Sequence, residues 1–355
     1  MKTAEIYKQR LLAALVVLAY ATMRITFNSQ YDGATWKQLF NFTAAKPFAM
    51  RVMIPLLGWP IQHITQWPAM YLVYIFEVAF SAALFWILIK LFLLLLPPRQ
   101  AFVASLAFFF VLPLQYLLNF AWPVLMPYDT AAIFFTALGL YTILQQRWRI
   151  LLLIMVLATL NRESAILLPL TTIILATDFP DFKRRTVIAI FCGVIYVVIR
   201  SSVIYIFRNS PGMTLPFMMS QQDTTHFCNN ALWLRQPVNA LQFMGYLSFL
   251  PLIWFFISNY IPRAVYRIKY VALFYFAVLS IFGNFYEPRV FGEMTVLIYV
   301  PCVLGLSRWM QHQPAFAWPK QMSVLQILER WGVMGLILIY IMLLPLISVS
   351  FGCYP

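Results

Sequence analysis

Long apolar runs with almost no charge follow one another along the chain, separated by short polar segments. Eleven such runs lie at 11–27, 70–96, 101–121, 130–145, 150–160, 164–177, 186–207, 240–258, 268–285, 291–307 and 332–350. They are too continuous for strands, and the short alternating pattern of a transmembrane barrel is absent. The pattern therefore predicts an all-α, polytopic transmembrane helical bundle of about 11 spans with uneven lengths, in one integral-membrane domain over 1–355.

Three of these runs are short for a span. Residues 130–145, 150–160 and 164–177 reach only about 16–24 Å as helices at 1.5 Å per residue, whereas the apolar core of a bilayer is about 30 Å thick. Tilting or local thinning of the bilayer would accommodate them. Alternatively, these helices end at a water-filled cavity on the outer side, which places the residues at their ends in water within the depth of the membrane.

Composition agrees with a membrane location and excludes several soluble classes. Hydrophobic residues make up 63% of the chain and charged residues 10%, against about 45–50% and about 25% in soluble domains. So few charges cannot cover a water-facing surface, which excludes a cytosolic enzyme, a secreted disulfide domain and a disordered protein. The phosphate-loop, dinucleotide-binding, zinc-protease, serine-hydrolase and CxxC motifs are absent, so we expect no cofactor and no metal.

The net charge of +14 is unevenly distributed. If the N-terminus is cytoplasmic and every run crosses the membrane, the cytoplasmic segments hold 16 of the 25 basic residues and four acids. The remainder of the chain holds 9 basic and 7 acidic residues. Positive loops face the cytoplasm in membrane proteins, so the charge predicts a cytoplasmic N-terminus and an extracytoplasmic C-terminus, and needs no nucleic-acid partner.

This topology gathers unusual polar residues on the extracytoplasmic side. The first outer loop, 28–69, is long and aromatic, and residues 34–42 and 52–66 within it suit helices lying in the membrane interface; 208–239 is the second long outer loop. Charges in or near spans are costly, so they pair or line a pathway. They mark either structural ion pairs between helices or a functional cavity, and the candidates are Asp32, Arg51, Tyr128, Asp129, Asn161, Arg162, Glu163, Arg200, Tyr286, Glu287, Arg289 and Glu293, with Arg24 and Glu77 inside runs.

Asp32 follows the first run by five residues and precedes Gly33. It is either an N-cap or turn residue for the 34–42 helix, or a carboxylate at the membrane surface that acts as a general base. Among the cysteines, Cys228 and Cys353 both fall on the predicted outer side, where an oxidising compartment would allow them to pair.

The layout resembles the GT-C superfamily of integral-membrane glycosyltransferases, especially its short bacterial members without a periplasmic domain. KPFAMRVMIPLL at 46–57 resembles their PFxxRxLxPLL pattern, and NRESAILLPL at 161–170 resembles a pattern that follows a short helix in these proteins. GNFYEPRVFGEM at 283–294 resembles a late outer loop with an E-x-R motif. The first helix, the long outer loop with an early Asp and the uneven helices that follow agree with this layout.

The resemblance implies transfer of a sugar from a polyprenyl-phosphate donor to a glycan or lipid-linked acceptor, in the bacterial inner membrane and facing the periplasm. By position the catalytic base is Asp32; since the paired acidic motif of many members is missing, Asp129 or Glu163 are alternatives. The cations expected to meet the donor phosphate are Arg51, Arg162, Arg200 and Arg289. The residues expected to bind or orient the sugar are Tyr128, Asn161, Tyr286, Glu287 and Glu293, with Trp122 for stacking.

Other functions remain open on the sequence. A transporter or flippase of a polar or lipid-linked anionic solute would also gather arginines and carboxylates, and a glycan polymerase or ligase would use closely related chemistry. A transport path needs polar groups through both halves of the membrane, whereas the inner halves of these runs are almost purely apolar. This favours chemistry on one side over a continuous path.

Overall fold

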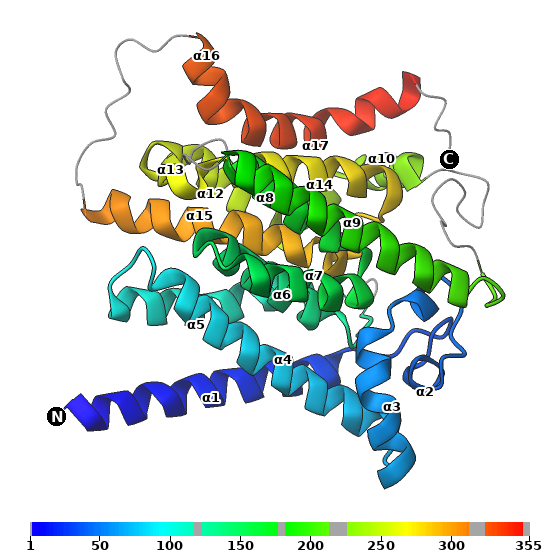
Figure 1. Ribbon diagram of the computed structural model, residues 1–355. Helices are drawn as coiled ribbons and strands as arrows, with labels where there is room; N and C mark the ends of the chain where they lie inside the picture. Colours follow the sequence, from blue (N-terminus) through cyan, green and yellow to red (C-terminus); the bar gives the residue numbers. More distant parts are fainter. Residues whose placement is uncertain (1, 117–122, 177–181, 213–225, 312–323, 351–355) are drawn as a thin grey trace. The chain divides into compact units, whose positions relative to one another are not determined.

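The computed structural model describes residues 2–116, 123–176, 182–212, 226–311 and 324–350 (Figure 1). Within these ranges the chain forms helices and no strand; two isolated bridges pair Ser29 with Val124 and Tyr31 with Ala34. Each of the apolar runs coincides with one or more helices, which confirms the prediction of an all-α fold.

The chain forms two compact units. Unit 1 comprises Met1–Thr172 and Lys183–Leu215, and unit 2 comprises Ile173–Phe182 and Pro216–Pro355. Each is described below by itself, and the single integral-membrane domain over 1–355 stays a prediction.

Unit 1 is built around the helices of the first half of the chain. Helix α4 lies against α1, α5 and α6, and α6 also packs against α7. Helix α6 buries side chains around most of its circumference, as a helix apolar on all sides does when it lies inside a bundle. The helices are α1 (Lys2–Phe27), α2 (Trp36–Phe40), η1 (Phe48–Met50), α3 (Met53–Thr65), α4 (Ala69–Phe92), α5 (Pro98–Tyr116), α6 (Asp129–Leu144), α7 (Trp148–Asn161), η2 (Glu163–Ile166), the start of α8 (Leu167–Ala176), and α9 (Phe182–Ile206).

The 28–69 loop contains both expected helices, α2 and α3. Helix α2 begins with a capping box, in which the Thr35 side chain accepts from the Gln38 backbone N–H and the Gln38 side chain accepts from the Thr35 N–H. Thr35 is therefore the N-cap, so an N-cap role for Asp32 is wrong. Asp32 and Gly33 instead form the turn between the bridged residues Tyr31 and Ala34.

Helix α3 runs across the direction of α1 and α4 (Figure 1). Its first turns pack into unit 1, where a Cβ on Gly58 would lie 2.2 Å from the Phe40 ring of α2. Its later residues are exposed and apolar, including Trp59 and Ile64. If α1 and α4 cross a membrane, this direction and composition suit a helix lying along the interface.

Unit 2 contains the remaining helices. Its core holds a group of four aromatic rings, Phe243, Phe276, Phe285 and Phe291, with centroids 4.6–6.3 Å apart. The helices are α10 (His226–Leu234), α11 (Pro237–Tyr246), α12 (Leu250–Ile257), η3 (Ser258–Tyr260), α13 (Arg263–Tyr266), α14 (Ile268–Phe282), η4 (Pro288–Phe291), α15 (Gly292–Gln311), α16 (Val324–Ile327), the π-helix η5 (Leu328–Gly332) and α17 (Val333–Ser350).

The 240–258 run is not one helix. Pro237–Tyr246 and Leu250–Tyr260 meet at a bend of 72°. The break has a local cause, because Ser248 and Phe249 adopt left-handed backbone angles and Pro251 stands in the first turn of α12, where a missing N–H is tolerated.

Five helices in the described part of the chain are long and apolar enough to cross a membrane, or six if the bent pair forms one span. The five are Glu5–Phe27, Ala69–Phe92, Phe182–Ile206, Arg263–Phe282 and Pro288–Gln311. The three short runs are short helices in the structure as well, at Asp129–Leu144, Trp148–Asn161 and Glu163–Leu175. The total of about 11 spans stays a prediction.

Candidate functional site

The 28–69 loop is attached to the segment that leads into α6. The Ser29 N–H donates to the Pro123 carbonyl at 2.7 Å, and the Leu125 N–H donates to the Ser29 carbonyl at 2.9 Å. The Trp36 indole Nε1 donates to the Leu125 carbonyl at 3.0 Å. These bonds bring residues from the first loop next to the start of α6.

Arg51, at the end of η1, contacts two of the predicted site residues. Its Nε donates to Glu163 Oε2 at 3.2 Å and its Nη2 donates to Glu163 Oε1, so the two side chains pair through two parallel hydrogen bonds. Its Nη1 donates to the Tyr128 hydroxyl at 2.7 Å. Together, the hydrogen bonds to Glu163 and Tyr128 hold the guanidinium group of Arg51 in one orientation.

Arg200 of α9 approaches the same carboxylate. Its Nη2 lies 3.5 Å from Glu163 Oε2, and its Nη1 donates to the Met50 carbonyl at 3.2 Å. From the same helix, the Tyr196 hydroxyl donates to the Glu163 carbonyl at 3.1 Å. Helix α9 therefore places a second cation beside Glu163.

The charges around Glu163 determine its ionisation. Partial burial opposes ionisation of this carboxyl, but the positive charges of Arg51 and Arg200 outweigh it and hold the pKa of Glu163 well below its usual range. Glu163 is therefore an anion at neutral pH and a weak proton acceptor. Its geometry suits holding the two arginines in place.

A second group of charges is buried between α1, α4, α6 and the end of α7. Arg24 Nη1 donates to Thr130 Oγ1 at 2.8 Å, and this hydroxyl donates to Glu77 Oε1 at 2.7 Å. Arg24 Nη2 lies 3.8 Å from Asp129 Oδ2, and Arg162 Nη1 lies 3.5 Å from Asp129 Oδ1. Two cations and two carboxylates thus neutralise one another inside the unit.

The two groups join through neighbouring residues. Tyr128 and Asp129 are consecutive, as are Arg162 and Glu163; in each pair one side chain contacts Arg51 and the other belongs to the buried group. We call the combined set of Arg24, Arg51, Arg162, Arg200, Glu77, Asp129 and Glu163 the arginine–carboxylate cluster. It contains four positive and three negative side chains.

Asn161 connects the helices that carry this cluster. Its Nδ2 donates to the Tyr128 carbonyl at 3.0 Å, which joins the end of α7 to the start of α6. The side chain is buried. Asn161 therefore helps to hold the backbone of Tyr128 in place.

The turn that carries Asp32 is connected to Arg51 of the cluster through two ring contacts. The ring of Tyr31, the neighbour of Asp32, packs on Phe48 at 5.2 Å between centroids, and the Arg51 guanidinium lies 5.7 Å from the Phe48 ring. The Asp32 side chain is exposed and, among the described residues, makes no hydrogen bond or ion pair. It is the accessible carboxylate of the first loop.

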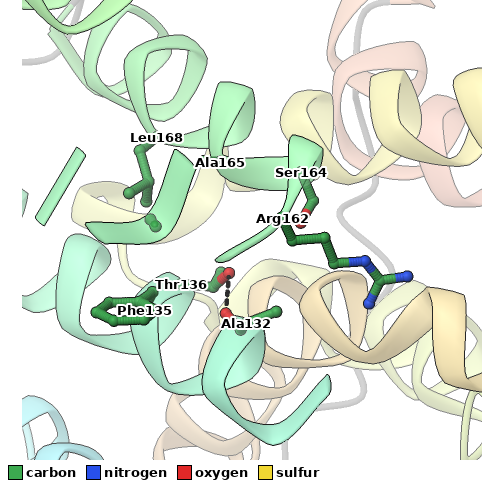
Figure 2. A pocket seen from close by; sticks show the side chains of 8 residues that line it. Ala132, Phe135, Thr136, Arg162, Ser164, Ala165 and Leu168 are labelled. Carbon is green, nitrogen blue, oxygen red and sulfur yellow. Dashed lines mark hydrogen bonds between the residues drawn. The ribbon is translucent and has the colours of Figure 1, made fainter. Parts of the chain in front are cut away.

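A small cavity lies behind Arg162. It has a volume of about 10 Å³, close to the space that one water molecule needs. Figure 2 shows the Arg162 guanidinium pointing away from Phe135 and Leu168, while Thr136 bonds to the Ala132 carbonyl. The cavity is too small for a sugar, so it does not represent a substrate site.

Unit 2 holds the remaining predicted residues. Arg289 Nη2 donates to Glu287 Oε2 at 3.0 Å. The Tyr275 hydroxyl lies 3.4 Å from Glu293 Oε2, and Glu293 is fully buried in the first turn of α15. Tyr286 is partly buried in the same loop.

Arg24 and Glu77 were candidates from the sequence, because each is a charge inside an apolar run. Other contributing residues were not among the candidates. Thr130 and Tyr196 in unit 1 gave no sequence signal, because a hydroxyl in a helix has many ordinary explanations. In unit 2, Asn284 donates to Glu287 at 2.8 Å and contacts His226 at 2.6 Å. The contact with His226 joins residues far apart in the sequence, so no local pattern predicts it.

Trp122, expected to stack on the sugar, lies outside the described residues. So does Cys353, the expected partner of Cys228, and Cys228 itself is disulfide-bonded. Cys192 and Cys302 are free and buried. Within the described ranges, no group of three or more His, Cys, Asp or Glu side chains is arranged to hold a metal ion.

No protein-family model and no curated protein sequence matches this chain. The fold and the site together define an all-helical protein with several helices suited to a membrane and with paired arginines and carboxylates buried among them.

Proposed function

We propose that this protein is a membrane glycosyltransferase, which moves a sugar from a polyprenyl-phosphate donor to a glycan or lipid-linked acceptor on the extracytoplasmic face of a bacterial inner membrane. The observation that supports this function best is the arginine–carboxylate cluster, together with the exposed Asp32 in the same loop as Arg51. It combines cations for a phosphate with a carboxylate for proton transfer.

The arginines suit the leaving group of such a reaction. When the sugar leaves the lipid phosphate, negative charge develops on phosphate oxygens, and preorganised cations stabilise that charge. Arg51 and Arg200 are each held by a further contact, to the Tyr128 hydroxyl and the Met50 carbonyl. Their side chains are 8% and 13% exposed, so they lie nearer the surface than the fully buried Arg24.

Asp32 suits the role of general base better than the other two carboxylates proposed for it. Glu163 pairs with Arg51 and Arg200, and Asp129 is enclosed between Arg24 and Arg162 with no exposed surface. A hydroxyl of the acceptor reaches Asp32 without breaking an ion pair. Asp32 then takes the hydroxyl proton as the oxygen attacks the anomeric carbon.

The lipid part of the donor needs an apolar surface at the edge of the site. Helix α3 follows Arg51 by two residues and exposes Leu56, Leu57 and Ile64. A helix of this kind lies at the boundary between acyl chains and head groups. It would hold the polyprenyl chain beside the arginines.

A transporter or flippase of a lipid-linked anionic solute is the second candidate. The observation in its favour is the depth of Arg24 and Glu77, which are fully buried in two of the candidate spans, since buried charges in spans often mark a path. A glycan polymerase or ligase would share the chemistry of the first proposal. Consumption of the donor separates transfer chemistry from transport.

The test uses purified protein and a panel of polyprenyl-phosphate hexoses and pentoses, with release of polyprenyl phosphate as the readout. We expect the wild type to consume at least one donor in the presence of membrane glycolipids. Asp32→Asn should lower the rate about a hundredfold or more, as expected for loss of a general base. Glu5→Gln, which changes an exposed carboxylate in the first turn of α1, is the matched control and should retain the wild-type rate.

One result would contradict the transferase, and another would contradict only the role of Asp32. Donor binding without consumption by the wild type would favour the transporter. Full activity of Asp32→Asn would remove Asp32 as the base while leaving the transferase itself in place.

A further inference from the structure

Glu163 differs in exposure from every other member of the arginine–carboxylate cluster. Its side chain is 40% exposed, whereas the other six range from 0% to 13%. It also lies in the connection between α7 and α8, outside the longer helices. An anion arriving from solvent would therefore meet this carboxylate first.

The two arginines around Glu163 keep other contacts that do not involve it. Arg51 donates to the Tyr128 hydroxyl, and Arg200 donates to the Met50 carbonyl. If the carboxylate moved away, these bonds would still hold both guanidinium groups close to their present positions. The pair is thus a preformed anion site that a side chain of the same protein occupies.

The geometry of this occupied site also suits phosphate. Glu163 binds Arg51 through two parallel N–H···O bonds, and a guanidinium group binds two phosphate oxygens in the same manner. Arg200, on α9, reaches Glu163 Oε2 as well. Two oxygens of one phosphate could replace the two carboxylate oxygens without rearranging the arginines.

We propose that Glu163 is an internal anion that holds the phosphate site between turnovers and exchanges with the phosphate of the lipid. The inference rests on the proposed function and deepens it. The donor phosphate displaces the carboxylate from Arg51 and Arg200 as it binds. After transfer, the carboxylate returns to the arginines and helps to expel the polyprenyl phosphate product.

The charge of the site explains why such an exchange is useful. Without Glu163 the cluster would carry four arginines against two carboxylates, and a polyprenyl phosphate with up to two negative charges would leave slowly. A competing carboxylate weakens the binding of both donor and product, which favours turnover when release limits the rate. Glu163 in this role tunes affinity and takes no part in bond making.

The experiment measures binding of inorganic phosphate and of undecaprenyl phosphate to purified wild type, Glu163→Gln, Glu163→Asp and the control Glu5→Gln. Glu163→Gln removes the competing charge and should bind phosphate at least about tenfold more tightly, because phosphate no longer displaces a charged group from the arginines. Phosphate should also raise the melting temperature of this variant more than that of the wild type. Glu5→Gln should behave as the wild type does.

Glu163→Asp provides a second test in case Glu163→Gln misfolds. It keeps the charge but shortens the side chain by one methylene, so its phosphate affinity should fall between those of wild type and Glu163→Gln. If Glu163→Gln does not fold, an affinity of Glu163→Asp equal to that of the wild type overturns the exchange.

The two ligands distinguish this inference from the proposed function. Tighter binding of both supports the exchange and the lipid donor together. Tighter binding of inorganic phosphate alone supports the exchange and contradicts a polyprenyl-phosphate donor. Unchanged affinity for both ligands in Glu163→Gln overturns the exchange, whatever the transfer assay shows, and leaves Glu163 as a structural ion pair.

Discussion

Glu163 joins three parts of unit 1 at a single carboxylate. Its side chain contacts Arg51 from the first loop and Arg200 from α9, while its own backbone follows α7. The first of these pairs is 112 positions apart in the chain. The sequence identified all three residues as candidates, but their pairing depends on helix packing that no local pattern encodes.

Removing this carboxylate should destabilise the protein moderately. Glu163→Gln leaves Arg51 and Arg200 without their anion, but the 40% exposure of Glu163 allows solvent to screen the charges, so we expect a loss of about 1–2 kcal/mol at pH 7. Thermal unfolding in detergent checks the value. A variant as stable as the wild type would show that the ion pair contributes nothing.

The same variant has a predictable pH dependence. The folded-state pKa of Glu163 is depressed by the two arginines, so its stabilising effect is fully present above the unfolded value of about 4.3 and is lost as pH falls through the lower folded value. The difference in melting temperature between wild type and Glu163→Gln should stay constant from pH 7 to about pH 5 and shrink below about pH 4. A difference that shrinks between pH 7 and 6 would contradict this assignment.

The buried charges should behave as a unit. Arg24→Met leaves Glu77 and Asp129 without one of their cations in a fully buried position, at a cost of about 3–5 kcal/mol. Adding Glu77→Met removes one of those stranded carboxylates. The double variant should therefore lose less stability than the sum of the single variants, by about 0.5–3 kcal/mol. Additive losses, measured by urea unfolding, would contradict direct coupling.

At the scale of elements, the positions of the helices were largely predictable. Continuous apolar runs predicted α1, α4, α6 and α7 because length and hydrophobicity are properties of the local sequence. The bend between α11 and α12 was missed, although Pro251 was a local signal. A run of apolar residues does not reveal whether its backbone continues straight, because that depends on what each half packs against.

Packing between α2 and α3 depends on one glycine. A Cβ at Gly58 would lie 2.2 Å from the buried Phe40 ring, so Gly58→Ala should cost about 1–3 kcal/mol by displacing that ring. The matched control is Gly193→Ala in α9, where nothing lies within 4 Å of the added carbon. It should be neutral or stabilise by about 0.5–1 kcal/mol, since alanine favours a helix interior. Equal effects of the two variants on thermal unfolding would contradict the close approach of α2 and α3.

At the scale of the whole molecule, charge predicts an orientation. Tyr128 at the start of α6 and Asn161 at the end of α7 are bonded to each other, so the connection between these helices lies at the opposite end, where Arg147 and Arg149 stand. The cluster and a strongly basic connection thus occupy opposite ends of the pair. The division of the chain into two units could not be predicted, because hydropathy carries no record of which helices contact one another.

Cysteine labelling tests this orientation. Thr65→Cys at the end of α3 and Gln145→Cys at the end of α6 are exposed positions. A membrane-impermeant maleimide should label Thr65→Cys in intact cells and Gln145→Cys only after permeabilisation. Cys192 and Cys302 are buried and should stay unlabelled, so the wild type provides the background. Labelling of both positions from the same side would contradict the predicted topology.

Binding of a lipid phosphate to the arginine–carboxylate cluster is the central claim, and a competition measurement tests it most directly. Radiolabelled undecaprenyl phosphate should bind to the purified wild type, and an excess of undecaprenol, which lacks the phosphate, should not displace it. Arg200→Gln should bind about tenfold more weakly, because it removes a charge-assisted contact. Displacement by undecaprenol, or unchanged binding in Arg200→Gln, would contradict a phosphate site at these arginines.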